Sequence, residues 1–224
     1  MYKLLEMKMK NFTRRTLLSV TTIAMVIGLA ACGGDTSSSS RSAIERDDDH
    51  ALGNPDAPVT IIEYASLTCP ACAAFHQTIY PELKAKYIDT GKVRFIFRQF
   101  PTPPARLAVG GEALARCEGS TETYFELIDV LFEKQRLWRS SQNPGQALRD
   151  IGATAGITTE QFDACLADTE NVTRIQDVVN HAVATWGINS TPSFVINGEY
   201  VQNIRSIDDF AKVIDPVLAN EENK

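Results

Sequence analysis

Hydrophobic residues follow three successive patterns within residues 53–102. Residues 59–65 form a nearly continuous β-branched run, which is typical of a strand buried on both faces. An apolar stripe with helical spacing comes next, formed by Cys72, Phe75, Ile79, Leu83 and Tyr87. Pro81 predicts a kink in this helix, and residues 93–98 return to strand character after Gly91. This order favours a βαβ unit with a right-handed crossover.

The segment 103–187 has helical periodicity only. Five helices are expected there, with these apolar residues on their buried faces: Leu107, Leu114 and Cys117; Tyr124, Ile128, Leu131 and Phe132; Leu148 and Ile151; Phe162 and Cys165; Val172, Ile175, Val179, Ala182 and Trp186. Thr158 and Gln161 predict a capping box at the start of the fourth helix. Gly187 stands in the usual position past the end of the fifth.

Strand character resumes in residues 193–201, where two short runs flank Asn197-Gly198. That dipeptide is the strongest short signal for a β-hairpin with a type I′ turn. Ser206 and Asp209 resemble a capping box at the start of a last helix. The chain is therefore expected to fold in the order β-α-β, helical block, β-β-α, which is an α/β fold.

Charge and hydropathy set the first 31 residues apart. Residues 1–31 carry a net charge of +4, whereas the rest of the chain carries −10. Residues 17–31 are mostly apolar but shorter than the roughly 20 residues that span a bilayer as a helix, so we expect a signal peptide. The acidic remainder argues against nucleic-acid binding and gives no long-range attraction to anionic lipid.

Cys32 stands at the end of this segment. The sequence Leu-Ala-Ala-Cys at residues 29–32 resembles the bacterial lipoprotein box, in which the cysteine is acylated and becomes the new N-terminus. Acylation of Cys32 would anchor the protein to a membrane through lipid. The alternative is an ordinary secretory peptide with a chance cysteine. Arg14-Arg15 also resembles a twin-arginine export signal, but a plain basic start fits equally well.

Cys69-Pro70-Ala71-Cys72 lies where the first strand pattern gives way to a helix pattern. A cysteine at a helix N-terminus meets free N–H groups and the positive end of the helix dipole, which favour thiolate over thiol. We therefore expect Cys69 to attack disulfides and the more buried Cys72 to resolve the mixed disulfide. Glu63 is the candidate proton acceptor for Cys72. A metal carrier that uses Cys69, Cys72 and His76 is a weaker alternative, because zinc normally takes four ligands and the sequence has no second Cys-x-x-Cys motif or pair of histidines.

The sequence resembles the thioredoxin-like DsbA family. The resemblance rests on Glu63 six residues before the first cysteine, on Cys-Pro-x-Cys, on Thr191-Pro192 and on the β-hairpin that follows it, together with the kinked helix and the helical block. The resemblance implies a thioredoxin fold with an inserted helical subdomain. It also implies that Thr191-Pro192 is a cis peptide packed against the cysteine pair. Pro70, Ala71, Thr191 and Pro192 would then border the groove for an extended substrate.

With 44% hydrophobic residues in a chain of 224, one folded core is the default. Composition and the resemblance together give the expected divisions of the chain. They are a signal peptide (1–31), a flexible tether (32–52), a first thioredoxin-like segment (53–102), a helical insertion (103–187), a second thioredoxin-like segment (188–219) and a tail (220–224).

Two residues depart from the best-known oxidases of the family. Ala71 replaces a histidine whose imidazole helps to stabilise the thiolate, so Cys69 is expected to be less acidic than in those enzymes. Thr191 is the residue type found before the proline in isomerase-like relatives. His76 could substitute for the missing imidazole, but we expect it on the helix surface, one turn beyond Cys72.

Cys117 and Cys165 remain as a second pair. Export and an even cysteine count favour a structural disulfide between them, similar to the extra bridge of one subgroup of the family, with buried free thiols as the alternative.

The leading hypothesis is therefore a monomeric, lipid-anchored periplasmic enzyme that introduces disulfides into reduced or unfolded exported proteins, without metal or cofactor. Its redox partner in the membrane would be DsbB-like. The alternatives are a disulfide isomerase or reductase with a DsbD-like partner, and a redox-quiet, chaperone-like binding module.

Overall fold

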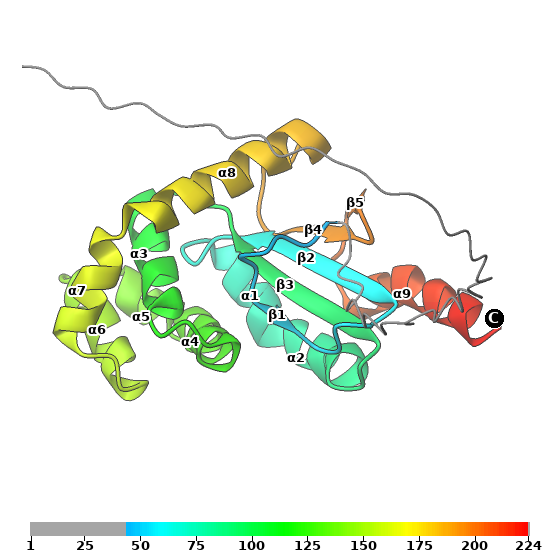
Figure 1. Cartoon of the computed structure of the whole chain (residues 1–224), viewed down its shortest axis with the longest axis horizontal. Helices are drawn as coiled ribbons and strands as arrows, with labels where there is room; N and C mark the ends of the chain where they lie inside the picture. Colours follow the sequence, from blue (N-terminus) through cyan, green and yellow to red (C-terminus); the bar gives the residue numbers. More distant parts are fainter. Residues whose placement is uncertain (1–43, 224) are drawn as a thin grey trace, which may run out of the picture. The chain divides into compact units, whose positions relative to one another are not determined.

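A five-stranded mixed sheet runs through the protein, whose computed structural model describes residues 44–223 (Figure 1). Its strands lie in the order β1-β3-β2-β4-β5. Their bounds are β1, Ala51–Leu52; β2, Val59–Ala65; β3, Val93–Gln99; β4, Ser193–Ile196; and β5, Glu199–Val201. The central β2 pairs in parallel with β3 and antiparallel with β4. The parallel pair confirms the expected βαβ unit. The expected signal peptide and Cys32 lie outside the described residues.

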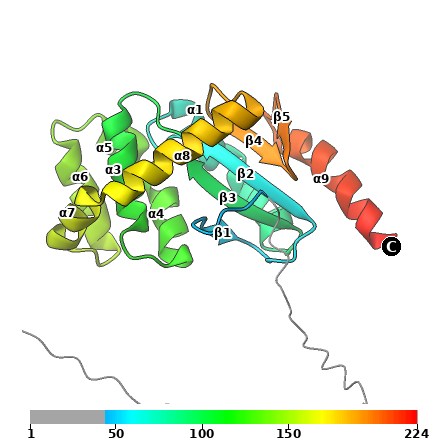
Figure 2. The same cartoon turned by 45° about the horizontal axis from the view of Figure 1, so that its top comes forward.

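The two faces of the sheet are covered by different helices. Along β2, Ile62 and Tyr64 pack with α8 (Thr169–Trp186) on one face, and Figure 2 shows α8 in front of the strands. Ile61 and Glu63 alternate with them and point to the opposite face, which carries α1 (Pro70–Thr78) and α9 (Ile207–Glu222). All seven residues of β2 are buried, as the continuous apolar run predicts.

The helix that follows the cysteine motif is broken into three segments. After α1 come α2 (Tyr80–Leu83) and a π-helical turn, Lys84–Ile88. The break lies at Ile79, two residues before Pro81, whose ring and missing N–H interrupt the hydrogen-bond ladder. The kink that Pro81 predicts is present.

Six helices, one more than expected, separate β3 from β4 in the described chain. They are α3, Ala105–Arg116; α4, Thr121–Glu133; α5, Gln135–Arg139; α6, Pro144–Thr154; α7, Thr159–Ala167; and α8. The extra helix is α5, which has only five residues and therefore no periodic signal. Thr158 and Gln161 form the capping box at the start of α7, and Gly187 ends α8 with a φ of 66°.

The C-terminal hairpin turns at Asn197 and Gly198, whose φ angles of 48° and 88° are those of a type I′ turn. The Ser206 side chain caps α9 by accepting a hydrogen bond from the Asp209 N–H. Helix α9 continues to Glu222, so the tail expected at 220–224 is largely helical. No helix within residues 44–223 is long and apolar enough to cross a membrane.

The last stretch of the expected tether, residues 44–52, is folded onto the sheet, and the expectation of a flexible segment up to residue 52 was wrong. Glu45 receives two hydrogen bonds from Arg94, at 2.8 and 2.6 Å. Asp49 receives two from the buried Arg98, at 3.1 and 2.6 Å. Both arginines project from β3. The acidic residues that suggested a flexible tether therefore bind two arginine side chains of the sheet. β1 completes the attachment by pairing with β3.

Candidate active site

Cys69 and Cys72 lie at the N-terminus of α1. Cys69 is the N-cap residue with extended backbone angles, and Pro70 occupies the first helical position. Cys69 is partly exposed, whereas Cys72 is completely buried one turn further in. The side chains that flank Cys69, those of Pro70 and Ala71, are exposed. Two thiols of the same motif therefore have different access to a substrate.

The surroundings of the two thiols shift their pKa values in opposite directions. A hydrogen bond from Cys72, together with others from Thr191 and the backbone N–H groups of Ala71 and Cys72, lowers the pKa of Cys69 to about 5 against the opposing effect of burial. Burial raises the pKa of Cys72, and the hydrogen bond to Cys69 and the charge of Glu63 raise it further. At neutral pH the reduced pair thus holds a thiolate at Cys69 and a thiol at Cys72.

Two segments distant in the chain contact the cysteine motif at Cys69. Its sulfur lies 3.5 Å from the carbonyl oxygen of Thr191, and the Thr191–Pro192 peptide is cis. The Gln135 side-chain amide donates hydrogen bonds of 2.9 Å to the carbonyl oxygens of both Leu67 and Cys69. Gln135 is thus a site residue that the sequence patterns did not reveal, because its contact joins α5 to a loop 66 residues away in the chain. A second cis peptide, Pro103–Pro104, was also not anticipated.

A cavity of about 440 Å³ lies beside the cis-proline. Its lining includes Pro192 and the polar residues Asn189, Ser190, Tyr200 and Gln202, but neither Cys69 nor Cys72. This polar hollow therefore adjoins the cis-proline and does not reach the two thiols.

Glu63 lies in β2 and faces α1 with no solvent-exposed surface. Its Oε2 accepts a hydrogen bond of 2.8 Å from Nε2 of His76. Its Oε1 is buried and has no hydrogen-bond partner within residues 44–223. The position of Glu63 near Cys72, inferred from the spacing, agrees with the effect of its charge on that thiol.

His76 is buried, and its expected place on the helix surface was wrong. The ring stacks on Phe132 of α4 with 4.1 Å between centroids. The ring contacts Glu63 of β2 and Phe132 of α4, so the helix is covered by two elements, and a single apolar stripe could not reveal the second contact. Burial opposes a charge on the ring, but the carboxylates of Glu63 and Asp129 raise the pKa of His76 to about 9.

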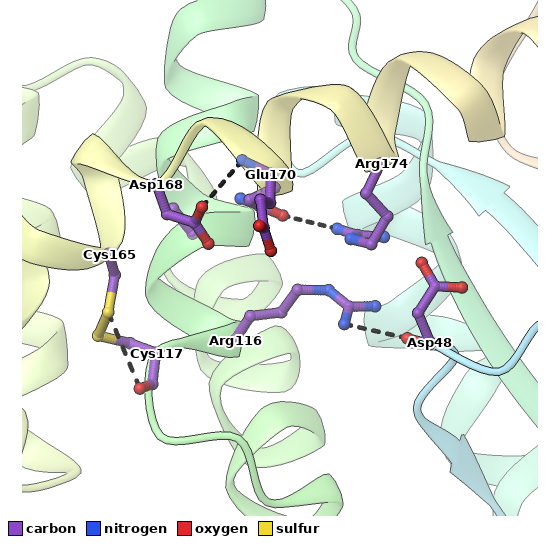
Figure 3. Close-up of a pocket in the computed structure, with 9 residues that line it drawn as sticks. Asp48, Arg116, Cys117, Cys165, Asp168, Glu170 and Arg174 are labelled. Atoms are coloured by element: carbon purple, nitrogen blue, oxygen red, sulfur yellow. Dashed lines mark hydrogen bonds between the residues drawn. A yellow bond between two sulfur atoms is a disulfide. The ribbon is translucent and has the colours of Figure 1, made fainter. Parts of the chain in front are cut away.

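The other cysteine pair lies in the helical insertion. A disulfide joins Cys117, at the end of α3, to Cys165 of α7, with 5.6 Å between the Cα atoms. Beside it is a cavity of about 490 Å³, whose lining includes Asp48, Arg116 and Arg174 (Figure 3). Within the described chain no cluster of three or more His, Cys, Asp or Glu side chains is arranged to hold a metal ion.

Comparisons with known proteins add the following relatives. Residues 45–216 match a family model described as thioredoxin. The chain is 35% identical to a putative protein-disulfide oxidoreductase of Rickettsia bellii, over 80% of this chain and 68% of that protein. The corresponding values for a putative protein-disulfide oxidoreductase of Rickettsia prowazekii are 36%, 80% and 64%, so the chain spans about two thirds of these relatives.

Two solved structures are similar. Wolbachia pipientis alpha-DsbA1 has a TM-score of 0.72 and 30% identity, covering 80% of this chain and 94% of that one. Oxidised BdbD from Bacillus subtilis has a TM-score of 0.66 and 24% identity, covering 77% and 94%, a likeness that concerns the fold alone.

Proposed function

The chain belongs to the DsbA family of thioredoxin-like protein-disulfide oxidoreductases, and from this premise we propose that it introduces disulfides into exported proteins through Cys69 and Cys72. The observation that carries the proposal is the contrast between the two thiols, an accessible thiolate beside a buried thiol. A thiol held as thiolate is a good leaving group, and its stability favours the reduced form of the enzyme, which makes the oxidised form a strong oxidant.

The reaction would run through a mixed disulfide. A substrate thiolate attacks the Cys69 sulfur of the oxidised pair, the bond to Cys72 breaks, and Cys72 leaves as a thiolate that must take up a proton. A second substrate thiolate then attacks the substrate sulfur of the mixed disulfide. This forms the substrate disulfide and releases Cys69 as a thiolate, so the two electrons pass from the substrate to the enzyme.

The surrounding residues have corresponding roles in this proposal. Glu63 exchanges the proton with Cys72, because its carboxylate is the buried charge that acts on that thiol. Pro70, Ala71, Thr191 and Pro192 border the place of an extended substrate. Exposed backbone next to a cis-proline can pair with a substrate strand by main-chain hydrogen bonds, which suits unfolded chains of any sequence. Position 71 supplies no imidazole, and the hydrogen bonds from Cys72, Thr191 and the helix start lower the pKa of Cys69 to about 5 without one.

The proposal is tested by following oxidation of a reduced peptide that contains two cysteines. The oxidised protein should form the peptide disulfide stoichiometrically, and Cys69→Ser should abolish the reaction. The matched control is the double variant Cys117→Ala/Cys165→Ala, which should retain the wild-type rate. Slow peptide oxidation combined with efficient reduction of insulin disulfides would indicate the isomerase or reductase instead. Absence of both reactions in the wild type would leave a chaperone-like binding module.

We propose further that the protein works as a monomer outside the cytoplasm and that a DsbB-like membrane protein reoxidises it. The boundaries between the thioredoxin-like segments and the helical insertion are proposed near residues 102 and 187.

We also propose that the protein is exported and anchored by lipid. The basic and apolar start of the chain and the lipoprotein-box resemblance at Cys32 support this. In cells fed a labelled fatty acid, the wild type should carry label and Cys32→Ala should not. Equal labelling of both would contradict acylation at Cys32.

A further inference from the structure

Behind Cys72, a row of polar groups leads from the buried carboxylate of Glu63 to the surface. Nε2 of His76 lies 2.8 Å from Oε2 of Glu63, and Nδ1, on the other side of the ring, lies 3.8 Å from Oδ1 of Asp129. The His76 and Glu63 side chains are 2% and 0% exposed, whereas Asp129 is 47% exposed. The ring is thus the link between a buried acid and an acid in contact with solvent.

The second side of the ring opens into a cavity. A volume of about 360 Å³ is lined by His76, Tyr80, Lys84, Asp129 and others between α1, α2 and α4. Two buried polar atoms of residues that line it, His76 Nδ1 and the Tyr80 hydroxyl, have no hydrogen-bond partner within residues 44–223. The 3.8 Å separation is too long for a direct hydrogen bond and suits a bridging water, for which the cavity has room.

We propose that His76 and Asp129 continue the proton path of Glu63 to solvent, so that His76 is a positioning residue through which Cys72 exchanges its proton. The inference rests on the proposed disulfide exchange and goes beyond it by naming the outward half of the path. When Cys72 leaves as a thiolate, the Nε2 proton of the charged His76 ring passes to Glu63 and from Glu63 to the Cys72 sulfur, which leaves a neutral ring with its proton on Nδ1. When Cys72 later loses its proton, that proton returns through Glu63 to Nε2. The charged ring exchanges its Nδ1 proton with water beside Asp129.

The charges around the ring support this role. Glu63 from β2 and Asp129 from α4 keep the ring protonated, and the pKa of His76 is raised to about 9. Tyr80 of α2 stays neutral across this range, because burial raises the pKa of its hydroxyl. Glu133 of α4 and Lys84 of the π-helical turn also line the cavity, and the Lys84 ammonium is paired with Asp89 at 2.5 Å. A protonated His76 is therefore available throughout the neutral range.

The test measures the rate of peptide oxidation against pH for His76→Gln, Asp129→Asn and the wild type. Glutamine can keep a hydrogen bond to Glu63 but cannot carry a proton, so His76→Gln should lower the rate near neutral pH by about a hundredfold, the lower end of what a positioned acid–base group contributes. The gap to the wild type should close as the pH rises past about 9, where His76 itself loses its proton. Asp129→Asn should reduce the rate by a smaller factor.

Glu126→Gln is the matched control, because Glu126 is an exposed carboxylate on the same helix α4 and does not line this cavity. It should leave the rate and its pH profile unchanged. A ratio of wild-type to His76→Gln rates that is the same at every pH would overturn the inference, since a purely structural loss has no reason to follow the ring's titration. If the wild type itself forms no peptide disulfide, the proposed oxidase function is contradicted. This outcome differs from an active wild type with a pH-independent rate ratio, which contradicts only the role of His76.

Discussion

The two cysteine pairs of this protein differ in what surrounds them. Cys69 and Cys72 are separated by two residues at a helix start, and hydrogen bonds and burial drive their pKa values apart. Cys117 and Cys165 are 48 residues apart, and their bond ties the end of α3 to α7. The comparison shows that the hydrogen bonds and the burial around each thiol distinguish a pair that can exchange electrons from a pair that crosslinks the fold.

The largest expected effect concerns the distal pair and is on stability. Removing a crosslink over 48 residues should lower the free energy of unfolding by about 4 kcal/mol in the chain-entropy model, so Cys117→Ala/Cys165→Ala should unfold at much lower urea concentration. The measurement compares urea unfolding of this variant and the wild type, each with Cys69 and Cys72 oxidised. A change below about 1 kcal/mol would contradict a fastening role for this bond.

The second expected effect is a pH dependence that belongs to the Cys69–Cys72 pair and not to the Cys117–Cys165 pair. Because the folded-state pKa of Cys69 is depressed to about 5, the reduced form gains stability as the pH rises from about 5 to about 8.5, the unfolded value, and loses it again as the pH falls. Ultraviolet absorbance of the thiolate should titrate with a midpoint near 5 in the wild type and in Cys117→Ala/Cys165→Ala alike. A midpoint near 8.5 would show that Cys69 is an ordinary thiol.

Local patterns predicted the elements that build the redox site. The β-branched run 59–65 is β2, the Cys-Pro-x-Cys opens α1, and Asn197-Gly198 turns the hairpin after Pro192. Each of these signals is contained in a few consecutive residues, where strand burial, helix capping and turn chemistry act directly. The α/β architecture followed from their order.

The groups that tune the site could not be found in this way. His76 is buried because α4 packs on the second side of α1, and Gln135 reaches the loop before Cys69 from the short helix α5. Asp49 looks like a member of a solvated acidic run, but it binds Arg98 on β3. Each contact joins segments distant in the sequence, so it depends on the assembled fold and leaves no periodic trace in the chain.

The reduction potential of the Cys69–Cys72 couple tests the central claim most directly. It is measured by equilibrating the protein with glutathione redox buffers and trapping the free Cys69 thiol at each ratio. Stabilisation of the Cys69 thiolate should place the potential above about −180 mV, on the oxidising side of protein disulfide isomerase. A value near about −270 mV, that of thioredoxin, would contradict an oxidase and show that the thiolate at Cys69 does not set the direction of electron flow.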